Sequence, residues 1–407
     1  MSKCIWIINQ YASHLETRHW ELAKSFAGNG YRVAVITSSY HHGKHMYLFD
    51  ENIKYVQKGD GITYVYLHSN PEYSSNGAKR VLNMICFSKM VNRYSADFAD
   101  KIGIPSYVIA SSAPPFVWES GYKAARKYNA KFIAEFRDIW PLSLIEIQGV
   151  NRYHPFVLLL SSFEKKTYRR ADAIVSTMPY AYKHVIEVSG VSKDKIFWMP
   201  NGINVREVQD DLISDSNLPA DLYDYLKSNW CGVYIGSIAK CECLDLLLSG
   251  FKEVNDPDIF FAVIGEGNEK DNIINYSNEL NLQNVKFFPA IDRHLIPKVL
   301  ANAKFAAAAI ENHSIYQYGL SMNKLNDYLV SGIPTVFACD VDNVVKDAGH
   351  FVVPTNDKTQ IAQAILKVKN LNDKDILELK ERAQKIISDH YDYTEIGKNY
   401  LKMMESL

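Results

Sequence analysis

Two lysines follow turns that lead into predicted helices, a placement that suits the binding of an anion. Lys240 comes after the strand-to-helix turn Gly236-Ser237-Ile-Ala, and Lys324 lies at the start of a second helix. The first N–H groups of a helix are unpaired and carry partial positive charge, so they bind phosphates well. A lysine beside them is unfavourable by about 0.3–1 kcal/mol unless an anion compensates. The pattern predicts phosphate binding; a tight packing turn with a solvated lysine is the structural alternative.

The segment that contains Lys324 carries further polar side chains around the helix start. Ser321 and Asn323 precede Lys324, and Asp327 stands one turn further along the helix, which is predicted to end at Gly332. A carboxylate accepts hydrogen bonds from hydroxyl groups. We therefore expect Asp327 to bind a sugar or ribose, with Ser321 and Asn323 as further substrate-binding residues.

A second glycine turn follows the strand predicted at residues 259–264. Gly265 and Gly267 permit close approach of the backbone to a ligand, because glycine has no side chain. Lys270 replaces the third glycine of the dinucleotide-binding pattern, so the turn disfavours an NAD site. We expect both glycines to bind substrate; a plain turn between a strand and a helix is the structural alternative.

The first half of the chain has its own charged segment, Glu135-Phe-Arg137-Asp138, at the end of a predicted strand. Asp138 or Glu135 is placed to orient an acceptor hydroxyl or to balance a developing positive charge, and Arg137 supplies a cation. An internal ion pair between Arg137 and Asp138 is the structural alternative. His19, on the first predicted helix, is a further substrate-binding candidate, with packing or helix capping as its alternative.

Metal binding is not expected. Cys241 and Cys243 are separated by one residue, but no second Cys or His pair stands at ligand spacing nearby. Asp340-Val-Asp342 matches the Asp-x-Asp string that binds Mn²⁺ or Mg²⁺ in other transferases, yet it lies in a loop after a predicted strand. The six cysteines are scattered along the chain, which indicates reduced thiols in the cytoplasm. We therefore expect a protein without a metal or cofactor.

Composition bounds the class of protein. A chain of 407 residues predicts two domains, and 47% hydrophobic with 22% charged residues is typical of globular proteins. The 45 Lys and Arg against 46 Asp and Glu exclude the broad positive field of a nucleic-acid binder. No stretch approaches the roughly 18 apolar residues that a membrane span needs, and the amino terminus does not resemble a signal peptide. We expect a cytoplasmic protein, soluble or peripheral on a membrane.

Short apolar runs alternate with helical patterns along both halves, so each half is predicted to be a doubly wound parallel α/β sheet. The division is predicted near residue 205, giving domains at 1–205 and 206–385 and a C-terminal helix at 386–407 that packs back toward the first domain. Ligands of such sheets bind beyond the carboxyl ends of the strands, which predicts a site in a cleft between the halves. The predicted strands are 5–8, 31–37, 63–67, 107–110, 131–136, 173–176, 231–235, 259–264, 284–288, 305–309, 335–338 and 350–353.

Several blocks of the sequence resemble the signature blocks of family 4 retaining glycosyltransferases, in family order. They are MPNGIN at 199–204, YIGSIAK at 234–240, VIGEGN at 263–268 and YGLSMNKLNDYLVSGIP at 318–334. The block EFRDIWP at 135–141 resembles the branch that builds bacterial O-antigen and capsular polysaccharide, including N-acetylfucosaminyl transferases. The resemblance implies the GT-B fold, in which an acceptor-binding and a nucleotide-sugar-binding Rossmann-like domain face each other across a cleft.

The resemblance also implies roles for individual residues. Lys240 stands where the family places an Arg or Lys on the donor diphosphate, and Lys324 joins it there. Asp327 takes the place of the second Glu of the family's Glu-x7-Glu motif, which holds the ribose, and Asn201-Gly202 matches the interdomain hinge.

The chain departs from the family pattern at three places. Gly319 replaces the first Glu of the motif, which leaves recognition of the donor sugar open, with Glu311 a loose substitute. Arg137 stands where many members have His, and the first loop, residues 10–18, lacks the usual glycines.

The implied activity is transfer of a sugar, with retention, from a nucleotide-diphosphate sugar. The branch implies a UDP-linked donor, an N-acetyl amino sugar, and an undecaprenyl-diphosphate-linked or polysaccharide acceptor in surface glycan biosynthesis. A non-hydrolysing sugar-nucleotide epimerase and a non-catalytic nucleotide-sugar-binding protein share these features and stay open. Release of nucleoside diphosphate only in the presence of an acceptor distinguishes the transferase from both.

Residues 151–170 combine apolar and basic side chains. The run from Phe156 to Leu160 is followed by Lys165, Lys166, Arg169 and Arg170. Such a mixture suits anionic headgroups and predicts attachment to the inner face of the plasma membrane. A core helix with a solvated basic end is the structural alternative.

Overall fold

The computed structural model describes residues 3–12, 18–75 and 77–407 and divides into two compact units. The first unit comprises the chain as far as Asn201 together with Gln317–Ser321 and Tyr393–Leu407, and the second comprises Gly202–Tyr316 and Met322–Asp392. The division after Asn201 lies close to the one predicted near residue 205. Two short segments, 317–321 and 393–407, leave the second half of the sequence and join the first unit.

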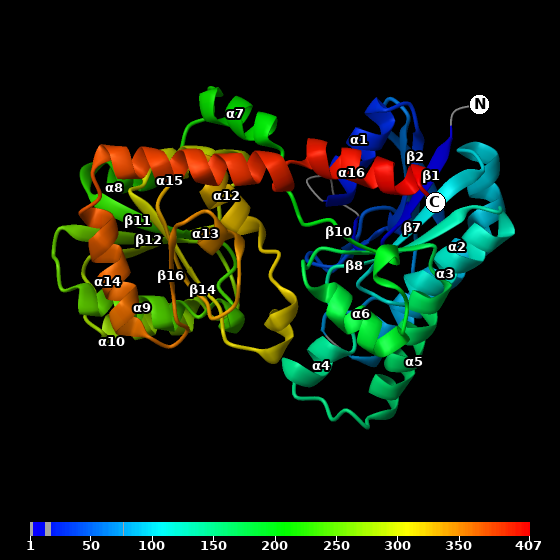
Figure 1. Ribbon diagram of the computed structural model, residues 1–407, viewed down its shortest axis with the longest axis horizontal. Helices are drawn as coiled ribbons and strands as arrows, with labels where there is room; N and C mark the ends of the chain where they lie inside the picture. Colours follow the sequence, from blue (N-terminus) through cyan, green and yellow to red (C-terminus); the bar gives the residue numbers. More distant parts are fainter. Residues whose placement is uncertain (1–2, 13–17, 76) are drawn as a thin grey trace. The chain divides into compact units, whose positions relative to one another are not determined.

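The first unit is built on a sheet whose described strands run in the order β10-β9-β8-β7-β1-β2-β6-β5 (Figure 1). All neighbours pair in parallel except β5, which is antiparallel to β6 at the edge. Its strands are β1 (Cys4–Ile8), β2 (Arg32–Ser38), β5 (Ile53–Gly59), β6 (Ile62–Leu67), β7 (Pro105–Ser112), β8 (Lys131–Phe136), β9 (Ala173–Ser176) and β10 (Ile196–Trp198), with a separate hairpin of β3 (Tyr40–His41) and β4 (Met46–Tyr47).

Helices accompany this sheet, and the last helix of the chain is one of them. The helices are α1 (Arg18–Gly28), α2 (Ala78–Lys101), α3 (Val117–Lys127), α4 (Leu142–Glu146), α5 (Pro155–Arg170), α6 (Ala181–Ser189), the short η1 (Lys193–Lys195) and α16 (Tyr393–Glu405). Helix α16 packs beside α1, and its Ile396, Tyr400 and Met404 share a buried core with Leu22 and Phe26 of α1. Of the C-terminal segment predicted at 386–407, residues 393–407 supply part of the core of the first unit, and the residues before 393 belong to the second unit.

The second unit is a six-stranded parallel sheet, counted over the described residues, in the order β13-β12-β11-β14-β15-β16. Its strands are β11 (Trp230–Ile235), β12 (Ile259–Ile264), β13 (Val285–Phe288), β14 (Phe305–Ala309), β15 (Thr335–Ala338) and β16 (Phe351–Val353). Its helical segments are α7 (Val205–Ile213), α8 (Ala220–Ser228), η2 (Lys240–Glu242), α9 (Leu244–Val254), α10 (Lys270–Glu279), η3 (Arg293–Leu295), α11 (Ile296–Asn302), α12 (Asn323–Ser331), α13 (Val344–Asp347), α14 (Lys358–Lys369), α15 (Asp373–Ile386) and η5 (Ile387–Tyr391), while η4 (Ser314–Tyr318) crosses the unit boundary.

The central strands are mostly apolar, because helices cover both faces of a parallel sheet. Every residue of β1 and β14 is buried. Gly232 in β11 makes room for its neighbour, since a Cβ there would lie 2.1 Å from the ring of Phe305. No helix in the described ranges is both long and apolar enough to cross a membrane.

Candidate functional site

The strand order of the second unit marks a place for a ligand. The chain builds β11, β12 and β13 outward in one direction and then returns to the other side of β11 with β14, β15 and β16. Ligands of doubly wound sheets bind beyond the carboxyl ends of the strands where the order reverses, here between β11 and β14. The predicted turn Gly236-Ser237 follows β11 directly, so it lies at this switch point.

Lys324 joins the Gly236 turn through a ring of hydrogen bonds. Its ammonium donates to the Tyr234 hydroxyl at 2.8 Å and pairs with Glu242. The Tyr234 hydroxyl donates to the carbonyl of Ser237 at 2.5 Å, and the Ser237 hydroxyl donates to Glu242 at 3.3 Å. Lys324 also covers Gly236, because a Cβ at that glycine would lie 3.0 Å from Lys324 Nζ. Lys324 and this turn therefore lie together, and binding of a substrate by them stays a prediction.

The start of α12 leaves backbone donors available near Lys324. Met322 is the N-cap residue and makes no side-chain capping bond, and Asn323 is the exposed first residue of the helix. Burial lowers the pKa of Lys324, against the opposing charge of Glu242. Uncapped N–H groups beside a half-buried ammonium form the kind of site that binds phosphate.

Asp327 lies on the buried side of α12, as do the predicted core residues Leu325, Tyr328 and Leu329. Its carboxylate pairs with Arg293 of η3 at 3.1 Å. Burial raises the pKa of Asp327 to about 6, although Arg293 acts in the opposite direction. Sequence reasoning missed Arg293, because nothing in its local pattern links it to a helix 34 residues later.

Gly265 and Gly267 are needed for contacts within the protein. A Cβ at Gly265 would lie 1.9 Å from the carbonyl oxygen of Gly236, and one at Gly267 would lie 2.0 Å from that of Ile238. The close approach expected between these glycines and a ligand is therefore an approach between two turns of the chain. Packing alone accounts for both glycines, and substrate binding by them stays a prediction.

Lys240 is exposed at the first position of η2, and its ammonium forms no hydrogen bond or ion pair with any described residue. It is Glu242, two residues later, that faces Lys324. The neighbouring Cys241 is exposed, and burial raises the pKa of Cys243 to about 12. In the Asp-x-Asp string, Asp340 accepts hydrogen bonds from Asn312 and Thr355, and Asp342 pairs with Lys346.

Ser321 belongs to the first unit, apart from the other predicted residues of its block. Its hydroxyl accepts a hydrogen bond from the backbone of Asn201 at 3.0 Å, and its carbonyl accepts one from the Asn201 side chain at 3.1 Å. Gly319 has a φ of 98°, and a Cβ there would lie 2.5 Å from Pro179. A glutamate at this position would be strained, so the departure from the family motif has a physical cause.

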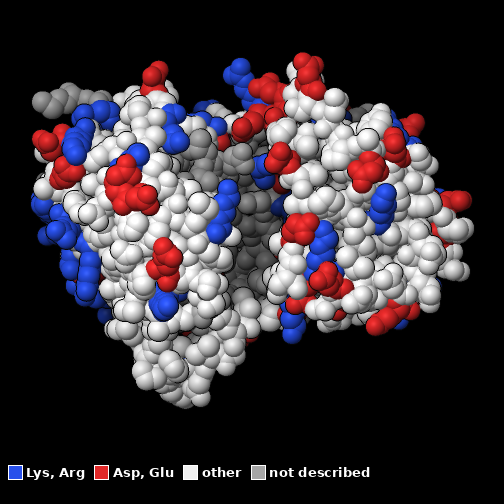
Figure 2. Space-filling model, turned by 180° about the vertical axis from the view of Figure 1, so that it is seen from behind, with Lys and Arg blue, Asp and Glu red and all other residues white. Residues whose placement is uncertain are grey.

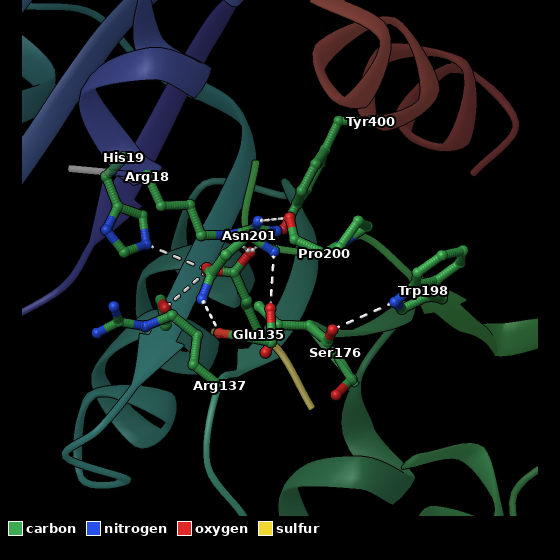
Figure 3. Close-up of polar contacts among 12 residues, drawn as sticks. Arg18, His19, Glu135, Arg137, Ser176, Trp198, Pro200, Asn201 and Tyr400 are labelled. Atoms are coloured by element: carbon green, nitrogen blue, oxygen red, sulfur yellow. Dashed lines mark hydrogen bonds and ion pairs between the residues drawn. The ribbon is translucent and has the colours of Figure 1, made fainter. Parts of the chain in front are cut away.

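The carboxyl edge of the first sheet holds a buried network centred on Glu135 (Figure 3). The Glu135 carboxylate pairs with Arg18 at 2.9 Å and His19 at 3.1 Å, and it accepts hydrogen bonds from Ser111 and Tyr400. Burial alone would raise the pKa of Glu135, but the Arg18 charge and these hydrogen bonds hold it well below its usual range. Burial lowers the pKa of His19.

Direct substrate binding by Glu135 and His19 is not supported by this arrangement. Both are fully buried, and the Glu135 carboxylate is occupied by groups of α1, β7 and α16. The packing role that was the alternative for His19 is the one the contacts fit. Glu135 anchors three elements at the carboxyl edge of the sheet.

Arg137 and Asp138 do not form the ion pair that was the structural alternative. Asp138 instead accepts from the Trp140 indole at 3.1 Å, and burial raises its pKa. Arg137 donates through Nε to the carbonyl of Ser112 at 3.4 Å, and its terminal nitrogens have no partner among the described residues. The buried hydroxyls of Ser112 and Thr177, at the same edge, are also unpaired within the described part of the chain. Unsatisfied buried polar groups are rare, which makes this edge a second candidate binding site.

Solved structures share this fold along the whole chain. Sucrose-phosphate synthase (tll1590) from Thermosynechococcus elongatus has a TM-score of 0.74 and 14% identity, over 99% of this chain and 98% of that one. Anabaena Alr3699/HepE, solved in complex with UDP, has a TM-score of 0.69 and 13% identity over 100% of both chains. At these identities the likeness shows the fold, and it confirms the expected GT-B class.

Family models match both halves of the chain. Residues 15–207 match Glycosyltransferase Family 4, and residues 227–386 match Glycosyl transferases group 1. The chain is therefore a glycosyltransferase with the GT-B fold, with a family 4 half and a group 1 half. WcaI of Escherichia coli (strain K12), whose name assigns it to colanic acid biosynthesis, is 22% identical over 142 residues, which is 35% of this chain and 35% of that relative.

Proposed function

We propose that this glycosyltransferase transfers a sugar, with retention of anomeric configuration, from a UDP-sugar to a lipid-linked or polysaccharide acceptor in surface glycan biosynthesis. The observation that carries the proposal is the meeting of Lys324, the uncapped start of α12 and the Gly236 turn at the switch point of the second sheet. HepE is solved with UDP and with UDP-glucose, which supports a uridine donor. WcaI supports a polysaccharide product.

The chemistry of transfer requires stabilisation of the departing diphosphate while positive charge develops at the anomeric carbon. Lys324 and the first N–H groups of α12 offset the negative charge of the leaving group, as preorganised donors do at other developing anions. The exposed Lys240 adds a second cation at the surface, in the η2 turn. In the first unit, Arg137 and Asp138 bind the acceptor at the carboxyl edge of the sheet.

Two residues of the second unit bear on the rest of the donor. Asp327 binds the ribose through the carboxylate oxygen that Arg293 does not hold. Glu311, exposed just after β14 and paired with His313 at 3.1 Å, takes over recognition of the sugar from the glutamate that Gly319 replaces. The donor sugar is an N-acetyl amino sugar, as the resemblance of the 135–141 block implies.

A nucleotide-sugar screen tests the proposed function. Thermal unfolding is recorded with a panel of UDP-, GDP- and dTDP-sugars, because a ligand at 100 times its dissociation constant stabilises the fold by about 2.7 kcal/mol. The expected result is a shift with one or more UDP-sugars, followed by UDP release only when a lipid-linked acceptor is added. UDP release or sugar isomerisation without acceptor would contradict transfer and favour a hydrolase or an epimerase.

The transfer proceeds without a divalent metal. Lys324 and the exposed Lys240 supply positive charge that a metal supplies in other transferases. Turnover is therefore expected to persist in excess chelator. Loss of turnover in chelator, restored by Mn²⁺, would overturn this part of the proposal.

The acceptor is reached at a membrane surface, on the cytoplasmic side, through the segment from α4 into α5. Leu158 and Leu159 are 52% and 55% exposed, and Tyr153 is also exposed. Basic side chains follow on the same helix, and Figure 2 shows this end of the first unit as largely uncharged, with Lys and Arg gathered along the unit's outer edge. The exposed leucines support membrane attachment over the alternative of a core helix.

Vesicle co-sedimentation tests the membrane attachment. The chain is expected to bind vesicles with anionic lipid better than neutral ones, and Leu158→Asp with Leu159→Asp is expected to abolish the binding. Leu377→Asp, an equally exposed leucine of α15, is the matched control. Equal partitioning between anionic and neutral vesicles would refute the proposal.

A further inference from the structure

Glu242 lies where a donor diphosphate would meet Lys324. Glu242 ends the η2 turn, and its carboxylate pairs with the Lys324 ammonium in the ring that also includes Tyr234 and Ser237. The side chains of Lys324 and Glu242 are 12% and 14% exposed, so the pair lies at the edge of solvent. Lys324 is thus already bound to an anion in the structure.

A carboxylate at this position conflicts with diphosphate binding. A diphosphate that approaches Lys324 and the start of α12 meets the negative charge of Glu242, and like charges a few ångströms apart repel strongly where water is scarce. At the same time Glu242 occupies the ammonium that the diphosphate needs. The ammonium has a third N–H group besides those that bind Tyr234 and Glu242, but a diphosphate oxygen that takes it lies beside the Glu242 carboxylate and is repelled by it.

Resting on the proposed function, we propose that Glu242 is an exchangeable counter-ion that competes with the donor diphosphate for Lys324. When the donor binds, Lys324 passes to the diphosphate and the Glu242 side chain turns to solvent. When the nucleoside diphosphate leaves, Glu242 returns to Lys324 and the ring closes again. Glu242 therefore weakens binding of donor and product and keeps Lys324 partnered in the empty enzyme.

The surroundings of Glu242 permit this exchange. Glu242 is in a three-residue turn at the surface, before the first residue of α9, so its side chain can rotate without a change in the helix. The diphosphate gains what a carboxylate at Glu242 does not reach, namely the uncapped N–H groups of α12. An anion that contacts both the ammonium and the helix start displaces one that contacts the ammonium alone.

Calorimetric titration of UDP into the full chain tests the proposal. Glu242→Gln keeps the shape of the side chain and removes its charge, and it is expected to lower the Kd for UDP about tenfold. Glu253→Gln is the matched control, because Glu253 lies near the C-terminal end of α9 and pairs with Lys358 of α14. No change in Kd is expected for this variant. In the Lys324→Gln background, Glu242→Gln is expected to lower the Kd for UDP by much less than tenfold. Circular dichroism and thermal unfolding check that each variant is folded.

The outcomes separate this proposal from the proposed function. If wild type binds UDP but Glu242→Gln binds it no better, Glu242 is not a competitor and the inference is overturned while the function stands. An equal gain with and without Lys324 also overturns it, since the effect would not pass through Lys324. If wild type binds neither UDP nor any other nucleoside diphosphate, the proposed function itself fails.

Discussion

The carboxyl edges of the two sheets both place an acidic side chain beside a cation, but the two pairs differ in burial and in completeness. In the first unit, Glu135 is fully buried and holds Arg18, His19, Ser111 and Tyr400. In the second, Glu242 and Lys324 lie at the edge of solvent beside an uncapped helix start. The first network is closed on itself, whereas the second can exchange a partner with a ligand.

The type of a charged residue does not by itself reveal its role. Glu135 and Arg137 are two residues apart, yet Glu135 has every oxygen occupied and Arg137 has terminal nitrogens without a partner in the described ranges. A buried ion whose atoms are all hydrogen-bonded stabilises the fold, because its removal leaves the opposite charge buried without a partner. An unsaturated one is free to bind a substrate.

The largest effect is expected at the closed network. Glu135→Gln leaves the Arg18 guanidinium buried without a counter-charge, which should lower the free energy of unfolding by about 3–5 kcal/mol. Urea denaturation measures this decrease in the free energy of unfolding. Glu119→Gln, which breaks exposed ion pairs with Lys123 and Arg170, should cost less than about 1 kcal/mol. Similar midpoints for the two variants would show that the Glu135 network does not hold the unit together.

The open pair should matter for turnover more than for stability. Lys324→Ala is expected to lower kcat by about 10²- to 10³-fold, as loss of one donor to a developing anion does elsewhere. Lys240→Ala should have a smaller effect, because the Lys240 side chain is exposed and unpaired within the described chain. Steady-state kinetics with saturating acceptor measure both. Wild-type kcat in a folded Lys324→Ala variant would remove Lys324 from the mechanism.

Asp327 should make stability depend on pH. Its pKa is raised by burial to about 6, so the folded chain binds a proton that the unfolded chain has released above about pH 4. Stability from Asp327 is therefore complete below about pH 4 and is lost as pH rises through 6, by about 2–3 kcal/mol in total.

Asp327→Asn tests this dependence, because asparagine stays neutral at every pH. The variant should match wild type near pH 4 and exceed it in stability above pH 6, as urea midpoints between pH 4 and 8 would record. Ser331→Ala, which loses only a bond to the Asp327 carbonyl, should keep the wild-type dependence. A difference between Asp327→Asn and wild type that does not vary with pH would contradict the raised pKa.

The smallest effect is expected for the link between Glu135 and the C-terminal helix. Tyr400→Phe removes one buried hydrogen bond to Glu135 and should lower the free energy of unfolding by about 1–2 kcal/mol. Tyr31→Phe, whose hydroxyl makes a long bond to Glu405 at 3.4 Å, is the control and should change little. Equal midpoints for Tyr400→Phe and wild type would mean that the hydrogen bond between Tyr400 and Glu135 does not stabilise the unit.

Most of the fold could be predicted from the sequence, because buried parallel strands read as apolar runs. The predicted strands 131–136, 259–264, 305–309 and 335–338 coincide with β8, β12, β14 and β15. The edge strands β5 and β10 were not predicted. Strand β5 is only partly buried and contains polar residues, and β10 has only three residues.

The site was less predictable, because its contacts join distant segments. The helix start around Lys324 was found from local pattern, but its partners Tyr234 and Glu242 are 90 and 82 residues away. Glu242 lies between Cys241 and Cys243, a pattern that suggests metal ligands and gives no sign of a pair with Lys324. Glu135 is a residue type that often acts in catalysis. Only the structure shows that both of its carboxylate oxygens are bound by groups of α1, β7 and α16, which identifies Glu135 as a structural residue.

A crystal structure of the chain with UDP would show where the diphosphate binds. We predict diphosphate oxygens within hydrogen-bonding distance of Lys324 Nζ and of the first N–H groups of α12, with Glu242 turned away from Lys324. A diphosphate bound instead at Arg137, with Lys324 and Glu242 still paired, would contradict this prediction.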